Sequence, residues 1–115
     1  MFKKCIFILA TSCMMYSCTT QTETNPFLTE FQTEHGVPPF DKIKLEHYEP
    51  AFLKGIEEQN ANIDAIVNNS EAPTFENVIV ALDNSSPILD RVSAIFYNMT
   101  EAETTDDLKE LSIKL

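Results

Sequence analysis

Apolar residues recur at helical spacing along much of the chain, and the first such segment runs from about Glu49 to Val67. Its apolar side chains fall within about 100° of one another on a helical wheel. They are Phe52, Ile56, Ile63, Ile66 and Val67. Pro50 sits where a helix can begin, because the first turn loses nothing by lacking an N–H. The pattern predicts a helix here, in which Gly55 indicates close packing against another helix.

A second helical pattern runs from Thr74 to Asn98, and Thr74 is a suitable N-cap for it. It carries two adjoining apolar stripes, which predicts that it is covered on two sides. One stripe contains Phe75, Val78, Ile79 and Leu82, and the other contains Ile88, Val92, Ile95 and Met99. A proline inside a continuous helix costs about 3 kcal/mol. We therefore predict a long helix with a break or sharp bend within Asp83 to Pro87.

A third helix is predicted from near Thr105 and Asp106 onward, through Leu108, Leu111 and Leu115. Ahead of the first helix, Pro38 and Pro39 favour an extended strap from Val37. Ile43 and Leu45 lie two residues apart in this strap, so both should press onto a core. No sustained alternating strand pattern is visible in the sequence. The predicted fold class is all-α.

The first residues have the layout of an export signal, with Lys3 and Lys4 followed by a mostly apolar run from Cys5 to Tyr16. A run of twelve residues is too short to cross a bilayer, which takes about 20. Small Ser17 directly precedes Cys18, as in a bacterial lipoprotein signal whose cysteine carries the lipid. Cys13 is the competing lipidation site, and an ordinary cleaved signal is the other alternative.

These features divide the chain into a signal peptide over residues 1–17, a polar tether over 18–24 and a helical region over 25–115. They predict an exported protein of the bacterial cell envelope or periplasm, held at a membrane by lipid on Cys18. The whole chain has a formal charge of −10, and removal of Lys3 and Lys4 with the signal leaves −12. Nucleic acid is not expected as a partner, since phosphate contacts need Lys and Arg.

Candidate catalytic chemistry is sparse in this sequence. The three cysteines all lie within the first eighteen residues, which excludes a disulfide framework or a cysteine-based zinc site from the rest. His35 and His47 are twelve residues apart, and neither begins a His-Glu-x-x-His zinc motif. We interpret both as surface or capping residues. The acidic pairs Glu57-Glu58 and Asp106-Asp107 should be solvated, because adjacent helical side chains diverge by about 100°.

Several sequence blocks, in this order, resemble the amino-terminal end of a family of zinc metallopeptidases. They are Asn25-Pro-Phe-Leu, Gly36-Val-Pro-Pro-Phe, Ile43 to Phe52, Pro73 to Ile79 and Leu89-Asp-Arg-Val. The family contains the bacterial peptidyl-dipeptidases, oligopeptidase A and thimet oligopeptidase. The likeness is stronger to the peptidyl-dipeptidases and extends over nearly all of residues 25–115.

This resemblance implies a longer, almost wholly helical enzyme with a deep channel between two helical halves, of which residues 25–115 are the truncated amino-terminal region. Zinc would be held there by two motif histidines and a later glutamate, all beyond Leu115, and the substrates would be short peptides. No catalytic or metal-binding residue is therefore assigned within this chain, which on its own should be inactive and bind no cofactor. The alternative is a small helical lipoprotein that acts as a binding or scaffold module.

Overall fold

The structure, a computed structural model, describes residues 24–115, and every regular element in that range is helical. The α-helices there are α1 (Leu45–Val67), α2 (Ala81–Asp83), α3 (Pro87–Ala102) and α4 (Asp106–Lys114). Two 3-10 turns, η1 (Pro26–Leu28) and η2 (Glu34–Gly36), precede them, and a π-helical segment, η3 (Phe75–Val80), leads into α2. The all-α prediction is confirmed. In this part of the chain we find no helix with the length and hydropathy needed to cross a membrane.

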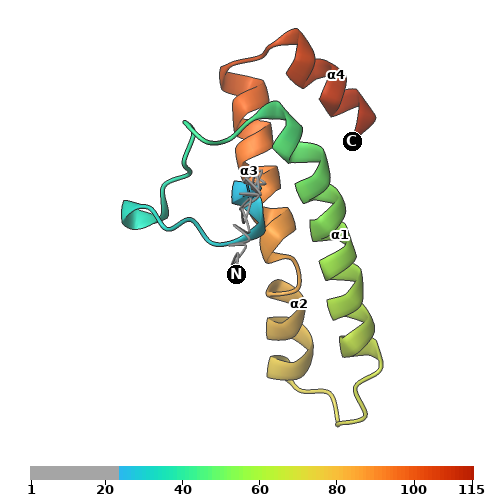
Figure 1. The fold of residues 1–115 in the computed structure, drawn as a ribbon. Coiled ribbons are helices and arrows are strands. Elements are labelled where there is room, and N and C mark those ends of the chain that lie inside the picture. Colours follow the sequence, from blue (N-terminus) through green and yellow to red (C-terminus); the bar gives the residue numbers. More distant parts are fainter. Residues whose placement is uncertain (1–23) are drawn as a thin grey trace, which may run out of the picture.

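The helices form a long antiparallel hairpin, with α1 on one side and η3, α2 and α3 on the other (Figure 1). Helix α4 then turns back towards the start of α1, where Lys114 pairs with Glu49 at 2.8 Å (Figure 1). The segment between η1 and α1 loops outward from the hairpin. It contains a tight turn in which both His35 and Gly36 have positive φ, at 59° and 69°.

The core lies where α1, α3, η1 and α4 meet. Its buried residues are Phe27, Tyr48, Ala51, Phe52, Val92, Ile95, Phe96 and Leu108. The aromatic rings form a continuous cluster, with centroids 5.1 Å apart for Phe27 and Tyr48 and 5.2 Å apart for Tyr48 and Phe96. Such tilted and edge-on ring pairs add to the stabilisation that burial alone provides. The core therefore stabilises one end of the hairpin, whereas η3 and α2 contain no buried residue.

The first helix begins at Leu45, so the predicted start at Glu49 was wrong by four residues. The extended strap ends at Lys44, whose backbone N–H donates to Nδ1 of His47 at 3.1 Å. This side-chain cap starts the helix early and leaves Pro50 inside it. As predicted, Ile43 packs against the core. Leu45 is exposed instead, because as a helical residue it no longer alternates with Ile43.

The predicted interruption before Pro87 is confirmed. Helix α2 ends at Asp83 and α3 begins at Pro87, so the break falls within the expected range. Groups on α1 satisfy the backbone that the break exposes. Asn62 Nδ2 donates to the carbonyl of Ser85 at 2.8 Å, and a Glu58 carboxylate oxygen accepts from the Ile88 N–H at 3.4 Å.

The other predicted helix starts are also confirmed. The Thr74 hydroxyl accepts a hydrogen bond from the Asn77 N–H at 3.1 Å, and the Thr105 hydroxyl accepts one from the Leu108 N–H at 3.2 Å. The π-helical winding of η3 was not predicted, because apolar spacing does not distinguish it from an α-helix over six residues.

The single apolar face expected on α1 is divided in the structure. Phe52 is buried in the core and Ile66 is half-buried, whereas Ile56 and Val67 are exposed. The reason is the position of Gly55, where α3 approaches so closely that an added Cβ would lie 2.7 Å from the Leu89 nitrogen. Ile56 is about 100° around the helix from Gly55, so it points away from this contact line. The close packing predicted at Gly55 is confirmed.

Replacing Gly55 with alanine is expected to destabilise the hairpin. The new Cβ would meet backbone atoms of Leu89 at 2.7 and 2.8 Å, so α1 and α3 would have to separate. Overpacking of this kind costs about 1–3 kcal/mol, which offsets the roughly 1 kcal/mol that alanine gains in helix propensity. Amide hydrogen exchange in α1 and α3 should be faster in Gly55→Ala. The exposed control Asn60→Ala should leave it unchanged or slow it, and equal rates in the two variants would contradict the packing role.

Candidate functional site

His47 occupies the first turn of α1 and is almost fully buried. Its ring Nδ1 accepts the Lys44 N–H, and its own carbonyl accepts from Asn25 Nδ2 at 2.7 Å. The first of these bonds uses the ring nitrogen Nδ1 and marks the point where the strap ends and the helix begins. The capping interpretation is confirmed, and the surface alternative for this residue was wrong.

His35 lies in the outward loop, where both it and Glu34 are exposed and their side chains approach to 3.5 Å. The surface interpretation of His35 is confirmed. Among residues 24–115, no three His, Cys, Asp or Glu side chains come together as metal ligands. This segment therefore does not fit the zinc site that the family resemblance implies.

The adjacent acids do not form carboxylate pairs directed at one point. Glu57 is exposed and pairs with Lys54 at 2.7 Å, and this contact raises the pKa of the Lys54 amine. Glu58 is half-buried against the start of α3, so its predicted solvation was wrong. The reason is that the Ile88 N–H, free at a helix start, attracts its carboxylate.

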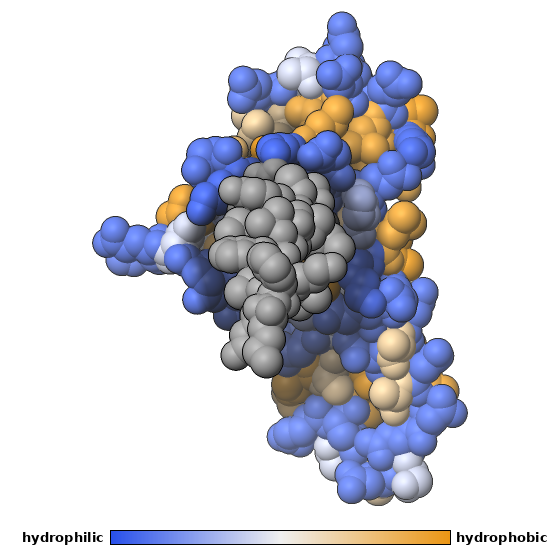
Figure 2. Space-filling model, viewed as in Figure 1, coloured by the Kyte–Doolittle hydropathy of each residue, from blue (hydrophilic) through white to orange (hydrophobic). Residues whose placement is uncertain are grey.

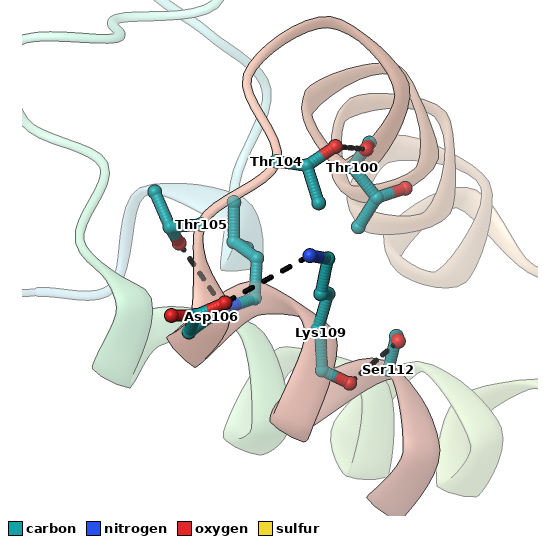
Figure 3. Close-up of polar contacts among 7 residues, drawn as sticks. Thr100, Thr104, Thr105, Asp106, Lys109 and Ser112 are labelled. Carbon is teal, nitrogen blue, oxygen red and sulfur yellow. Dashed lines mark hydrogen bonds and ion pairs between the residues drawn. The ribbon is translucent and has the colours of Figure 1, made fainter.

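Asp106 and Asp107 are both exposed in the first turn of α4, as predicted. Figure 3 shows the Asp106 carboxylate directed at the Lys109 amine, 3.8 Å away, beside the Thr105 cap. The Thr104 and Ser112 hydroxyls also donate hydrogen bonds to backbone carbonyls of the preceding turn. These polar groups therefore stabilise the ends and turns of the helices. Nothing in the cluster is arranged for proton transfer to a substrate.

A hollow of about 350 Å³ lies between the far end of α1 and the η3–α2 segment. It is lined by three apolar residues and four asparagines, namely Asn62, Ala65, Ile66, Asn69, Asn77, Ala81 and Asn84. The amides of Asn62 and Asn84 donate to backbone carbonyls of the same hairpin. No acid, base or nucleophile lines the hollow, which therefore offers hydrogen bonds without catalytic groups.

A second hollow, of about 320 Å³, lies beside the outward loop and is lined by Phe40, Ile43, Tyr48, Met99 and Glu103. Burial raises the pKa of the Tyr48 phenol, which is neutral near pH 7 even without this shift. The only acid in the lining is Glu103, which is exposed. This hollow also lacks a paired acid and base.

The polar contacts that the sequence did not predict hold the amino-terminal segment in place. Arg91, on α3, donates from Nη1 to the Phe27 carbonyl at 2.7 Å, and its guanidinium lies 5.6 Å from the centre of the Phe31 ring. Asn25 caps the same segment, because its Oδ1 accepts from the Phe27 N–H at 3.1 Å. Lone Asn and Arg residues at these positions gave no sign of a partner 22 to 64 residues away.

Comparison with known proteins finds relatives over most of this chain. It is 43% identical over 88 residues to a dipeptidyl carboxypeptidase of Salmonella typhimurium, and 42% identical over 90 residues to that of Escherichia coli. It is also 30% identical over 87 residues to oligopeptidase A of Escherichia coli. These matches cover 76–78% of this chain but only 12–13% of the relatives. No family model matches the chain.

Proposed function

We propose that this chain, a member of the family that includes dipeptidyl carboxypeptidase and oligopeptidase A, is part of a zinc-dependent peptidase that releases dipeptides from short peptides. The observation that carries the proposal is the 42–43% identity to two dipeptidyl carboxypeptidases, against 29–30% for two oligopeptidases A. The match spans about an eighth of each relative, which supports assigning this segment to the amino-terminal helical region of a longer enzyme.

The contribution of residues 25–115 to that enzyme is structural. Their histidines and acids cap helices, pair with lysines or face water, and the described residues bring together no metal-ligand group. We therefore place the zinc ligands and the general base in the part of the polypeptide beyond Leu115. There the metal would supply an activated water for attack on a peptide carbonyl.

The proposed activity can be tested on the product of the complete gene. Incubated with short peptides, it should release carboxyl-terminal dipeptides, detected by mass spectrometry. A chelator should abolish the release and added zinc should restore it. Residues 25–115 alone should release none, because they carry no pair of histidines at ligand spacing. A gene product that leaves every peptide intact would contradict the proposal and support the scaffold alternative.

We also propose that the protein is exported and held at a membrane by lipid on Cys18, a residue outside the described range. The short apolar run that ends in Ser17 and Cys18 supports this. Cells expressing Cys18→Ala and supplied with a labelled fatty acid should yield unlabelled protein, whereas Cys13→Ala should remain labelled. Label that persists in Cys18→Ala and disappears in Cys13→Ala would move the attachment site to Cys13. The same labelling experiment tests the proposed boundaries of the signal peptide and the tether, because both are defined by lipid attachment at Cys18.

A further inference from the structure

The start of the described chain is fixed to the body of the hairpin. Asn25 Nδ2 donates to the His47 carbonyl at 2.7 Å, and Asn25 Oδ1 accepts from the Phe27 N–H at 3.1 Å. Phe27 is fully buried, and Arg91 on α3 donates to its carbonyl at 2.7 Å. The amino-terminal segment therefore cannot separate from α1 and α3 without exposing the core. A lipid on Cys18 would hold the hairpin at this point.

The chain between the lipid and this attachment point is short. Seven peptide units separate Cys18 from Asn25, and even a fully extended chain of that length spans at most about 25 Å. Helix α1 rises about 30 Å from His47, whose carbonyl binds Asn25, to Val67. The hairpin tip, the turn over residues 68–74 that joins α1 to η3, lies beyond Val67 (Figure 1). If the tip pointed at a bilayer, Asn25 would lie at least about 30 Å above its surface, beyond the reach of the tether.

Charge divides the hairpin along the same direction. Gly55 lies against Leu89, so residues 55–90 form one continuous part of the hairpin that includes its tip, and we call this part the tip half. The tip half contains seven Asp and Glu residues and no Lys or Arg. The base, residues 25–54 and 91–115, contains six Lys and Arg residues and ten acids. Figure 2 shows hydrophilic side chains over much of the visible face of the tip half, at the lower end of the view.

A bilayer that contains anionic lipids has a negative surface potential, which repels acidic segments within about 10 Å at moderate salt. This repulsion acts more strongly on the tip half, with a net charge of −7, than on the base, with −4. The tether length and the charge distribution therefore favour the same orientation. We infer that η1 and the outward loop that follows it form the membrane-facing side of the protein, with lipid headgroups as their partner. The hairpin tip points away from the bilayer.

This inference rests on the proposed lipid attachment at Cys18, and its test is energy transfer between labelled protein and labelled lipid. The lipidated product of the complete gene is reconstituted in vesicles of phosphatidylcholine and phosphatidylglycerol that contain an acceptor-labelled lipid. A donor dye is attached through p-azidophenylalanine in place of Glu30 in one variant and of Glu71 in a matched control. Both glutamates are exposed, and Glu30 follows η1 whereas Glu71 lies in the hairpin tip. The donor at position 30 should be nearer the bilayer by about 20 Å or more, a large part of the length of α1.

Equal transfer from the two positions, or stronger transfer from position 71, would overturn the orientation. Cys18→Ala should abolish vesicle binding and transfer from both positions, and transfer retained in that variant would also overturn the inference. Fatty-acid labelling of the same preparations separates the two proposals. A labelled protein with equal transfer overturns the orientation alone, and an unlabelled protein overturns the lipid attachment together with it. Dipeptide release by these preparations tests the peptidase proposal independently of both.

A second measurement isolates the contribution of charge. Asp64→Lys with Asp83→Lys replaces two exposed acids at the ends of α1 and α2, where lysine is compatible with the helix dipole. With the donor in place of Glu71, transfer should rise in vesicles that contain phosphatidylglycerol and remain unchanged in pure phosphatidylcholine. Equal changes in the two kinds of vesicle, or no change in either, would contradict the role assigned to charge.

Discussion

Substituting Phe27 by alanine is expected to abolish the amide protection of α1 and α3. The Phe27 side chain is 0% exposed, and its ring contacts those of Phe31 and Tyr48. Removing a buried phenylalanine costs about 3–5 kcal/mol, since both the burial and the contacts around the cavity are lost. Hydrogen exchange at the affected amides should accelerate by about 10² to 10³ or more, because each 1.4 kcal/mol is roughly a factor of ten.

Hydrogen exchange suits this test because it reports the opening of each element even where a protein does not unfold as one unit. The matched control is Leu28→Ala, which alters the next residue of the same turn but one that is half in solvent. Its exchange rates should stay close to those of the parent chain. Slow exchange retained in Phe27→Ala would show that η1 adds little to the core.

The elements that the sequence predicted correctly are those set by local chemistry. Pro87 breaks a helix through its own ring and missing N–H, and Thr74 and Thr105 cap the residues that follow them directly. These effects act within a few residues, so they can be interpreted without knowledge of the fold. The same reasoning identified Gly55 as a point of close packing, although not the residue that it contacts.

What the sequence could not show depends on partners far along the chain. The few apolar residues around Phe27 form too short a pattern to predict an element, yet this residue lies at the centre of the core. Arg91 fixes it there through a bond across 64 positions. The early start of α1 depends on a ring nitrogen of His47, which apolar spacing does not report. Glu58 was wrongly predicted to be solvated. The sequence does not show that the packing of α3 brings the Ile88 N–H within reach of its carboxylate.

The family was identifiable from the sequence for a different reason. The blocks that carry the likeness, such as Asn25-Pro-Phe-Leu and Leu89-Asp-Arg-Val, do not contain the His-Glu-x-x-His motif of a zinc peptidase. The structure gives them a role in packing, since Asn25, Phe27 and Arg91 hold the amino-terminal segment against α1 and α3. These blocks therefore indicate how the segment folds. By themselves they do not indicate how a peptide is cleaved.

Residues 25–115 on their own are expected to bind a hydrophobic dye strongly and to melt gradually. Phe75, Ile79 and Leu82 share one side of η3 and α2 and are between 49% and 66% exposed. These two elements contain no buried residue, and the core lies at the other end of the hairpin. A chain of fewer than 100 residues has little stability in reserve. Helical circular dichroism should thus persist over a broad temperature range without a sharp transition.

Paired substitutions can assign the dye signal to this surface. Phe75→Gln with Ile79→Gln should clearly reduce dye fluorescence and preserve the helical dichroism, because neither side chain contributes to the buried core. Val92→Gln is the control, since it places an amide at a fully buried position and should reduce the dichroism while raising dye binding. A cooperative melt without dye binding would show instead that the hairpin is a self-sufficient domain. That result would favour the scaffold alternative, because the helices would then need no further part of a peptidase to cover them.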